Sequence, residues 1–157
     1  MIEVSYKNAD TIAIKNADKK EILFNFSDKT VHMEDYDVTH PGEYEKSGNL
    51  LEVKEYTDLL FYKFLIDGKH MCIVTSDSFE LKEEIVGFFG DVDILIIIGT
   101  KDAVKIFENI EAKLVIPYGE GKDLFLHTLG QHSEAIKVSK IGSDLSGDRT
   151  EFVNLED

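Results

Sequence analysis

Several residue types are scarce in this chain, and cysteine is the clearest example. The only cysteine is Cys72, so no disulfide can form within the chain. No apolar run approaches the roughly 20 residues that a membrane-spanning helix needs. The first residues, MIEVSYKNAD, have neither the basic nor the apolar region of a signal peptide. We therefore expect a cytoplasmic protein with no membrane partner.

Cationic residues are also scarce. The chain has 17 Lys and Arg residues against 31 Asp and Glu residues, a formal net charge of −14, and Arg149 is its only arginine. Nucleic-acid binding depends largely on cations that contact phosphates, so we expect no nucleic-acid partner. A phosphate site built from several arginine forks is excluded as well. The acidic balance fits an ordinary solvated surface, with attraction of a basic protein partner as the alternative.

The chain does have enough length and hydrophobic content for one folded domain. It has 157 residues, of which 43% are hydrophobic and 31% are charged, so it can bury a core of its own. No linker, internal repeat or low-complexity tract divides the sequence. We therefore expect a single domain that spans residues 1–157.

The stretch from Gly90 to Gly119 is the most strongly patterned part of the sequence. It opens with the apolar run Ile94–Ile98, which is typical of a strand buried on both faces. Four apolar residues then recur at helical spacing: Ala103, Ile106, Phe107 and Ile110. A second apolar strand, Lys113–Ile116, follows, so the pattern predicts a right-handed βαβ unit with parallel strands. Within this unit we expect Ile96 and Ile98 to be buried.

Short strands with alternating residues and tight turns fill the first half of the chain. Helices appear only later. Asp77 and Glu80 form a capping box that predicts a helix ending at Gly90, and Thr100 suits the N-cap of the next helix. The remaining elements that the pattern predicts are a third helix over 122–129 and strands over 2–6, 11–15, 21–26, 30–33, 41–45, 50–56, 59–66, 70–75, 135–138 and 150–155.

Three segments together resemble the metallo-β-lactamase superfamily, and in particular its branch of ascorbate-6-phosphate lactonase and relatives. They read HPGEYEKSG from His40, CIVTSDSFELKEEIVGFFGDVDILIIIG from Cys72 and AKLVIPYG from Ala112. The resemblance implies an α/β fold of the metallo-β-lactamase type. This is an αββα sandwich with mixed sheets and helices on the outer faces, here in a shortened version.

The hydrolases of that superfamily hold one or two metal ions, usually zinc, through a His-x-His-x-Asp-His loop, a bridging Asp and a final His. This chain lacks the loop motif, and Gly119 stands where the resemblance places the final His. Only Asp77 matches a ligand position, and Ser76 replaces the Gly before it. One carboxylate cannot hold a catalytic zinc. We therefore expect no catalytic residue, no cofactor and a helix-capping role for Asp77.

A rival interpretation places a metal on other residues. The polar segment from Glu34 to His40, together with the residues just before it and Asp77, offers five donors of the right type: His32, Asp35, Asp37, His40 and Asp77. With zinc bound there, the protein would be a divergent metal-dependent hydrolase of a phosphoester or lactone. Other reactive residues favour no site: Cys72 lies inside an apolar strand, and the Gly119–Gly121 loop suits a flexible turn.

The expected function is therefore that of a degenerate, metal-free member of the fold. Such a protein would act as a binding, scaffolding or assembly component. We expect it to form a homo-oligomer, because the strand Leu59–Ile66 has large apolar side chains on both faces that a short chain leaves uncovered.

Overall fold

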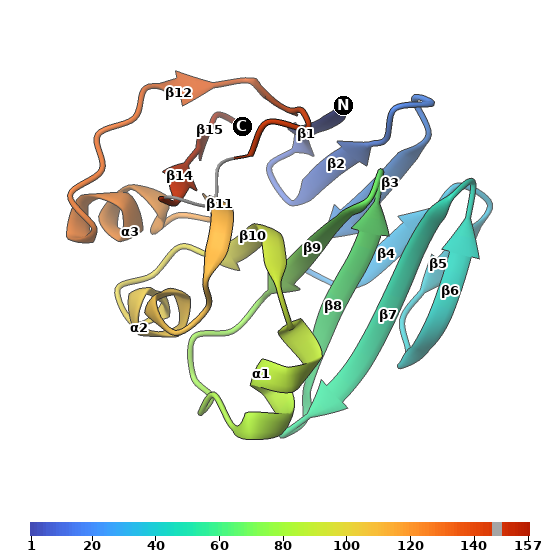
Figure 1. Cartoon of the computed structure of the whole chain (residues 1–157), viewed down its shortest axis with the longest axis horizontal. Coiled ribbons are helices and arrows are strands. Elements are labelled where there is room, and N and C mark those ends of the chain that lie inside the picture. The colour runs from blue at the N-terminus through green and yellow to red at the C-terminus, as the bar shows by residue number, and fades with distance from the viewer. Residues whose placement is uncertain (146–148) are drawn as a thin grey trace.

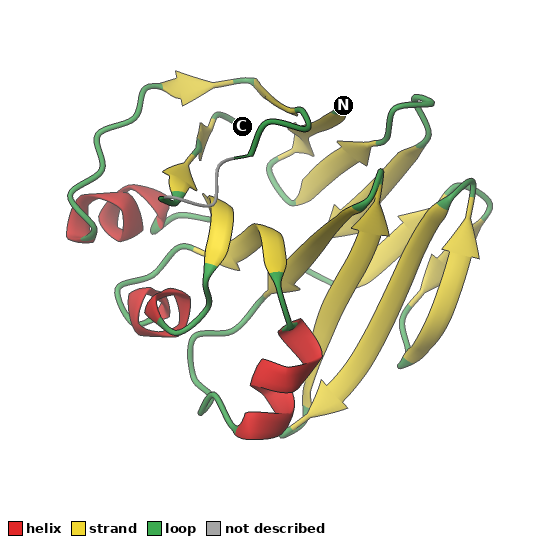
Figure 2. Cartoon of the chain, in the orientation of Figure 1, coloured by secondary structure: helices red, strands yellow, loops and turns green. Residues whose placement is uncertain are grey.

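Two β-sheets with different strand directions form the body of the protein (Figures 1 and 2). The computed structural model describes residues 1–145 and 149–157. Its elements are β1 (Ile2–Asn8), β2 (Thr11–Lys15), β3 (Glu21–Asn25), β4 (Thr30–Met33), β5 (Tyr36–Val38), β6 (Gly42–Lys46), β7 (Asn49–Tyr56), β8 (Leu59–Ile66), β9 (Lys69–Val74), α1 (Glu83–Phe89), β10 (Val92–Ile98), α2 (Ala103–Glu108), β11 (Ala112–Tyr118), α3 (Lys122–Thr128), β12 (Ala135–Ile136), β13 (Val138–Ile141), β14 (Glu151–Phe152) and β15 (Asn154–Leu155).

The first sheet has six strands in the order β13-β1-β2-β3-β4-β5, and every pair in it is antiparallel. The second sheet has seven strands in the order β14-β11-β10-β9-β8-β7-β6. Its strands β6 to β9 form an antiparallel meander, whereas β9, β10, β11 and β14 run parallel. The predicted βαβ unit is confirmed as β10-α2-β11, in the parallel half of this sheet.

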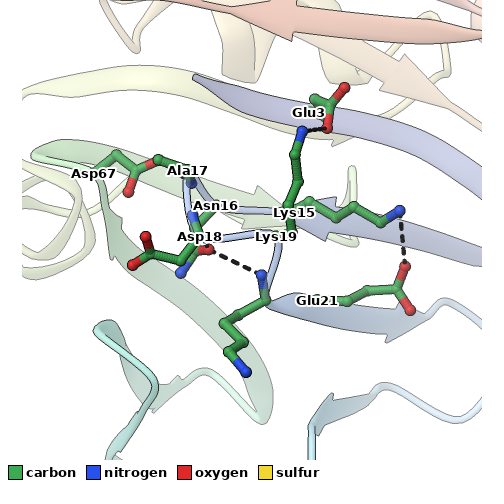
Figure 3. A network of polar contacts seen from close by, with 9 residues as sticks. Glu3, Lys15, Asn16, Ala17, Asp18, Lys19, Glu21 and Asp67 are labelled. Carbon is green, nitrogen blue, oxygen red and sulfur yellow. Dashed lines mark hydrogen bonds and ion pairs between the residues drawn. The ribbon is translucent and has the colours of Figure 1, made fainter.

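The main hydrophobic core lies between the two sheets. Alternate residues of each strand point into it, because successive side chains of a strand point to opposite faces. Ile96 is fully buried there, as predicted, while Ile98 is only half-buried at the end of its strand. At the sheet margin, the β2–β3 turn contacts the other sheet. The Ala17 backbone amide donates to the Asp67 carboxylate (2.8 Å; Figure 3), and the Asn16 side-chain amide donates to the Asn49 side-chain oxygen (3.1 Å).

A second hydrophobic cluster lies on the outer face of the seven-stranded sheet. Helices α1, α2 and α3 bury their apolar sides there against β8 to β11. Figure 1 shows all three helices on this side of the molecule. No described helix packs on the six-stranded sheet, and none is long and apolar enough to cross a membrane.

The start of α1 corrects one prediction. The capping box at Asp77 and Glu80 is wrong, because α1 begins only at Glu83 and its N-cap, Lys82, makes no side-chain cap hydrogen bond. Tertiary contacts hold the preceding segment in a non-helical path. Phe79 packs edge-on against Phe61, with ring centroids 5.0 Å apart. These contacts override the local helix signal.

The surroundings of β8 bear on the reason given for self-association, which was that large apolar side chains on both of its faces lie uncovered. Its outward residue Phe61 is 1% exposed, because Phe79 and Phe89 cover it. Its inward residues Tyr62 and Phe64 lie in the core between the sheets. The inward face of this strand is therefore covered within one chain, and on its outward face Phe61 is covered while Leu59 and Leu65 are half-buried. Smaller corrections concern the polar segment 34–40, which contains β5, and the last two predicted strands, which divide into β12 with β13 and β14 with β15.

Candidate functional site

The carboxyl ends of β9, β10 and β11 meet at one edge of the seven-stranded sheet. Parallel strands in register place the residues after them side by side: Asp77 after β9, Thr100 after β10 and Gly119 after β11. In open α/β sheets, ligand sites lie outside these ends. This edge is therefore the place where a metal site of the metallo-β-lactamase type would have to be built.

Asp77 forms a hydrogen bond to a neighbouring loop at this edge. Its Oδ2 accepts a hydrogen bond from the Thr100 hydroxyl at 2.7 Å, and the Thr100 hydroxyl oxygen accepts one from the Ala103 amide at 3.1 Å. Thr100 therefore supports the start of α2 through its hydroxyl, but the N-cap residue of this helix is Asp102 and not Thr100 as predicted. The carboxylate links the loop after β9 to the loop after β10 and caps no helix itself.

The Gly119–Gly121 loop is a packing contact. A Cβ on Gly121 would lie 2.1 Å from the Gly99 carbonyl oxygen, and a Cβ on Gly99 would lie 2.5 Å from the Lys122 Cα. The two βα loops therefore touch backbone to backbone, which only glycine permits at both places. The prediction of a flexible turn is wrong for Gly121, since this residue is fixed by Gly99.

An aromatic cluster fills the space between the two sheets beside this edge. Phe26, which follows β3, stacks on Tyr118 at the end of β11, with ring centroids 3.8 Å apart and an angle of 7° between the planes. Tyr6 and Phe24 pack against Phe26, and Phe24 packs against Tyr62. The ring pair Phe26–Tyr118 joins one sheet to the other.

The Tyr118 hydroxyl is the unusual atom of this cluster. It is buried and has no hydrogen-bond partner among the residues that the structure describes. Burial raises the pKa of this phenol, and the nearby Tyr6 and Tyr62 raise it further. Tyr62, by contrast, donates its hydroxyl to the Lys29 carbonyl at 3.1 Å. Burial raises the pKa of Tyr62 to about 12, so both phenols stay neutral at physiological pH.

We expect the variant Tyr118→Phe to raise the free energy of unfolding by ~0.5–1.5 kcal/mol. It removes a buried hydroxyl without a partner and leaves the ring stack intact. Tyr62→Phe is the matched control, because it removes a hydroxyl that is hydrogen-bonded and should lower stability by a similar amount. Urea denaturation of the three proteins measures both. Equal losses in the two variants would show that the Tyr118 hydroxyl has a partner in solution.

The donors of the rival metal site do not converge. His32 contacts Asp37 across the β4–β5 hairpin, with 2.6 Å between Nδ1 and Oδ1, and Asp35 forms an ion pair with Lys46 at 3.1 Å. His40 is exposed before β6, and Asp77 is bonded to Thr100 at the other sheet. Across residues 1–145 and 149–157, no three His, Cys, Asp or Glu side chains come together closely enough to hold a metal.

The residues present therefore do not fit the zinc that the fold family implies. A catalytic zinc needs about three protein ligands and one open position. At the sheet edge the Asp77 carboxylate is bonded to Thr100, and no group of three ligand side chains forms there among the described residues. No reaction step through a metal can be built on these side chains.

The other reactive side chains form no site either. Burial raises the pKa of the Cys72 thiol to about 12, so it is not a nucleophile at physiological pH. His127 and His132 lie near each other beyond α3, with ring centroids 5.8 Å apart, and both are exposed. No pattern in the sequence predicted the cluster around Tyr118. Its signal was the aromatic residue directly before Gly119.

Comparison with known proteins supports the fold. No family model and no curated protein match the chain. Among solved structures, a Thermotoga maritima protein superposes with a TM-score of 0.73 over 98% of both chains, at 16% sequence identity. It is described as a candidate zinc-dependent hydrolase of the metallo-β-lactamase superfamily. This chain has the metallo-β-lactamase fold. The predicted metallo-β-lactamase-like sandwich is confirmed, but the described helices cover only one of its two outer faces and only the seven-stranded sheet is mixed.

Proposed function

We propose that the protein is a non-hydrolytic member of this fold, related to the branch of ascorbate-6-phosphate lactonase, and that it acts as a binding or assembly component. One observation carries the proposal. At the sheet edge that would hold the metal, no three ligand side chains of the described residues come together, the Asp77 carboxylate is bonded to Thr100, and the stacked pair Phe26–Tyr118 lies nearby. A fold does not determine an activity, which depends on the groups at the site.

The alternative is a divergent metal-dependent hydrolase of a phosphoester or lactone. The description of the Thermotoga maritima protein favours it. At 16% identity, however, the superposition shows that the two backbones follow the same path; it does not show that this chain has the same metal-binding residues. The alternative would need His32, Asp37 and His40 to move toward a common centre, and His32 would have to give up its contact with Asp37.

Elemental analysis tests the proposal directly. After incubation with zinc, manganese or iron and removal of free metal, we expect below ~0.1 metal ion per chain, because isolated carboxylates bind such ions weakly. Phosphodiesterase and lactonase assays on the same samples should give the rate of buffer alone.

Two variants make this experiment decisive. Asp77→Asn removes the carboxylate at the sheet edge, and His40→Ala removes an exposed imidazole of the rival site. We expect neither to change the metal content. One metal per chain that disappears in either variant, together with hydrolysis that needs that metal, would overturn the proposal and establish the hydrolase.

A further inference from the structure

The outer face of the six-stranded sheet is open, since the described helices all pack on the other sheet (Figure 1). Successive side chains of a strand point to opposite faces. In β13, β1, β2 and β3, each residue that lies between two core residues along the strand therefore points outward on this face. The register of these four strands aligns the outward side chains in rows across the sheet. Two adjacent rows matter for contact with a second copy: one is charged and the other is mainly apolar.

The first row alternates in charge. Across β13, β1, β2 and β3 it consists of Lys140, Glu3, Lys15 and Glu21. Figure 3 shows the last three, with Glu3 bonded to Lys19 (3.0 Å) and Lys15 paired with Glu21 (4.0 Å). Two lysines and two glutamates leave this row with no net charge, and Lys7 and Lys19 pair with its glutamates, in a chain of net charge −14. This part of the face therefore lacks the negative charge that dominates the chain as a whole.

The second row is apolar at its ends and small in its centre. Across the same four strands it consists of Val138, Ser5, Ala13 and Leu23. Val138 is 42% exposed, Ser5 and Leu23 are half-buried, and Ala13 is covered by its neighbours. Small central residues allow the close approach of another flat surface, such as a sheet packed at ~10 Å.

We propose that two copies of the chain pack face to face through these two rows, about a two-fold axis that runs along the strands between β1 and β2. This axis places β1 opposite the partner's β2 and β13 opposite the partner's β3. Glu3 then lies opposite the partner's Lys15, and Lys140 lies opposite the partner's Glu21. In the second row, Val138 lies opposite the partner's Leu23. The order of charges is self-complementary under this axis, as a two-fold interface requires.

A strand edge suits a second copy less well. One edge strand of the seven-stranded sheet is β6, where the exposed Glu43 and Glu45 flank the half-buried Tyr44. Antiparallel pairing of two β6 strands about Tyr44 would put these glutamates opposite each other, and like charges in that position are destabilising. Pairing through this edge is therefore disfavoured, and the balanced face of the six-stranded sheet is the better contact.

The proposed interface is small. Four strands at a spacing of ~4.8 Å give a contact ~15–20 Å wide, at the low end of specific interfaces, so the dissociation constant should be micromolar. The dimer rests on the proposed function, because it is one form that an assembly role could take. The two proposals can fail independently: metal content tests the non-hydrolytic function, and molecular mass tests the dimer.

Sedimentation velocity across about 1 to 500 µM, a range that brackets micromolar affinity, tests the dimer. We expect the mass to rise with concentration from 17.8 kDa toward twice that value. Ser5→Arg places a long side chain at the centre of the face and should weaken the dimer at least ~10-fold. Leu124→Arg, on exposed α3, is the matched control and should leave it unchanged. A constant 17.8 kDa, or equal association in Ser5→Arg, overturns the proposal.

Charge reversal tests the axis itself. Glu3→Lys puts lysine opposite the partner's Lys15, and Lys15→Glu puts glutamate opposite the partner's Glu3, so each variant alone should be monomeric. An equimolar mixture restores both opposite pairs between two different chains and should recover the dimer. Within one chain the lost ion pairs stay lost, so recovery cannot come from monomer stability. Thermal melts confirm that each variant is folded, and absence of recovery in folded variants overturns the proposal.

Discussion

Replacing Ile96 with Asp should lower the free energy of unfolding by at least ~3 kcal/mol. Ile96 is 0% exposed in the middle of β10, between neighbouring strands on both sides and against the other sheet. A carboxylate there has no cation to pair with and loses its hydration, and such groups are among the most destabilising substitutions known in cores. Urea denaturation, or loss of soluble protein on expression, measures the effect.

Ile136→Asp is the matched control for this variant. It makes the same chemical change in β12, where the Ile136 side chain is 41% exposed. We therefore expect the free energy of unfolding to change by no more than ~0.5 kcal/mol. If Ile96→Asp folds with unchanged stability, the placement of β10 at the centre of the sandwich is wrong.

Replacing Gly121 with Ala should cost ~2–4 kcal/mol, which is large for the addition of one methyl group. Gly121 has φ of −92°, so alanine can adopt its backbone conformation without strain. The cost comes from space alone, because the new Cβ would lie 2.1 Å from the Gly99 carbonyl oxygen and the two loops must separate. Chemical denaturation measures the change, and the melting temperature should fall with it.

Gly87→Ala gives the opposite expectation from the same change. Gly87 lies in α1, and nothing lies within 4 Å of the Cβ that alanine would add. Alanine favours the helix over glycine by ~0.5–1 kcal/mol, so this variant should be more stable than the parent protein. If both glycine variants gain stability, the contact between Gly99 and Gly121 does not exist in solution.

The pair Gly99–Gly121 and the bond Thr100–Asp77 explain how the loops at the carboxyl ends of the parallel strands are held together. Both contacts join neighbouring loops at the carboxyl ends of the parallel strands. The stack of Phe26 on Tyr118 joins the two sheets beside them. Packing and hydrogen bonding therefore supply the cross-links at this edge, which is consistent with the non-hydrolytic role that we propose.

The sequence by itself determined the secondary structure wherever the pattern was local. The run around Ile96 specified a strand buried on both faces, and alternation specified strands such as β2 and β8, because period two follows from the strand backbone alone. The missing histidine loop likewise led, through the resemblance to the metallo-β-lactamase superfamily, to the expectation that a zinc-binding set is lacking. These conclusions needed no knowledge of distant neighbours.

The tertiary structure alone decided the features that depend on residues far apart in the chain. Asp77 follows a local capping pattern, yet its carboxylate bonds to Thr100, because the register of β9 and β10 brings the two loops together. Phe79 and Phe89 cover Phe61, the largest of the outward apolar side chains that the sequence placed on β8. The stack of Phe26 on Tyr118 joins residues of different sheets, and no local pattern encodes such a contact, since it forms only when both sheets are packed.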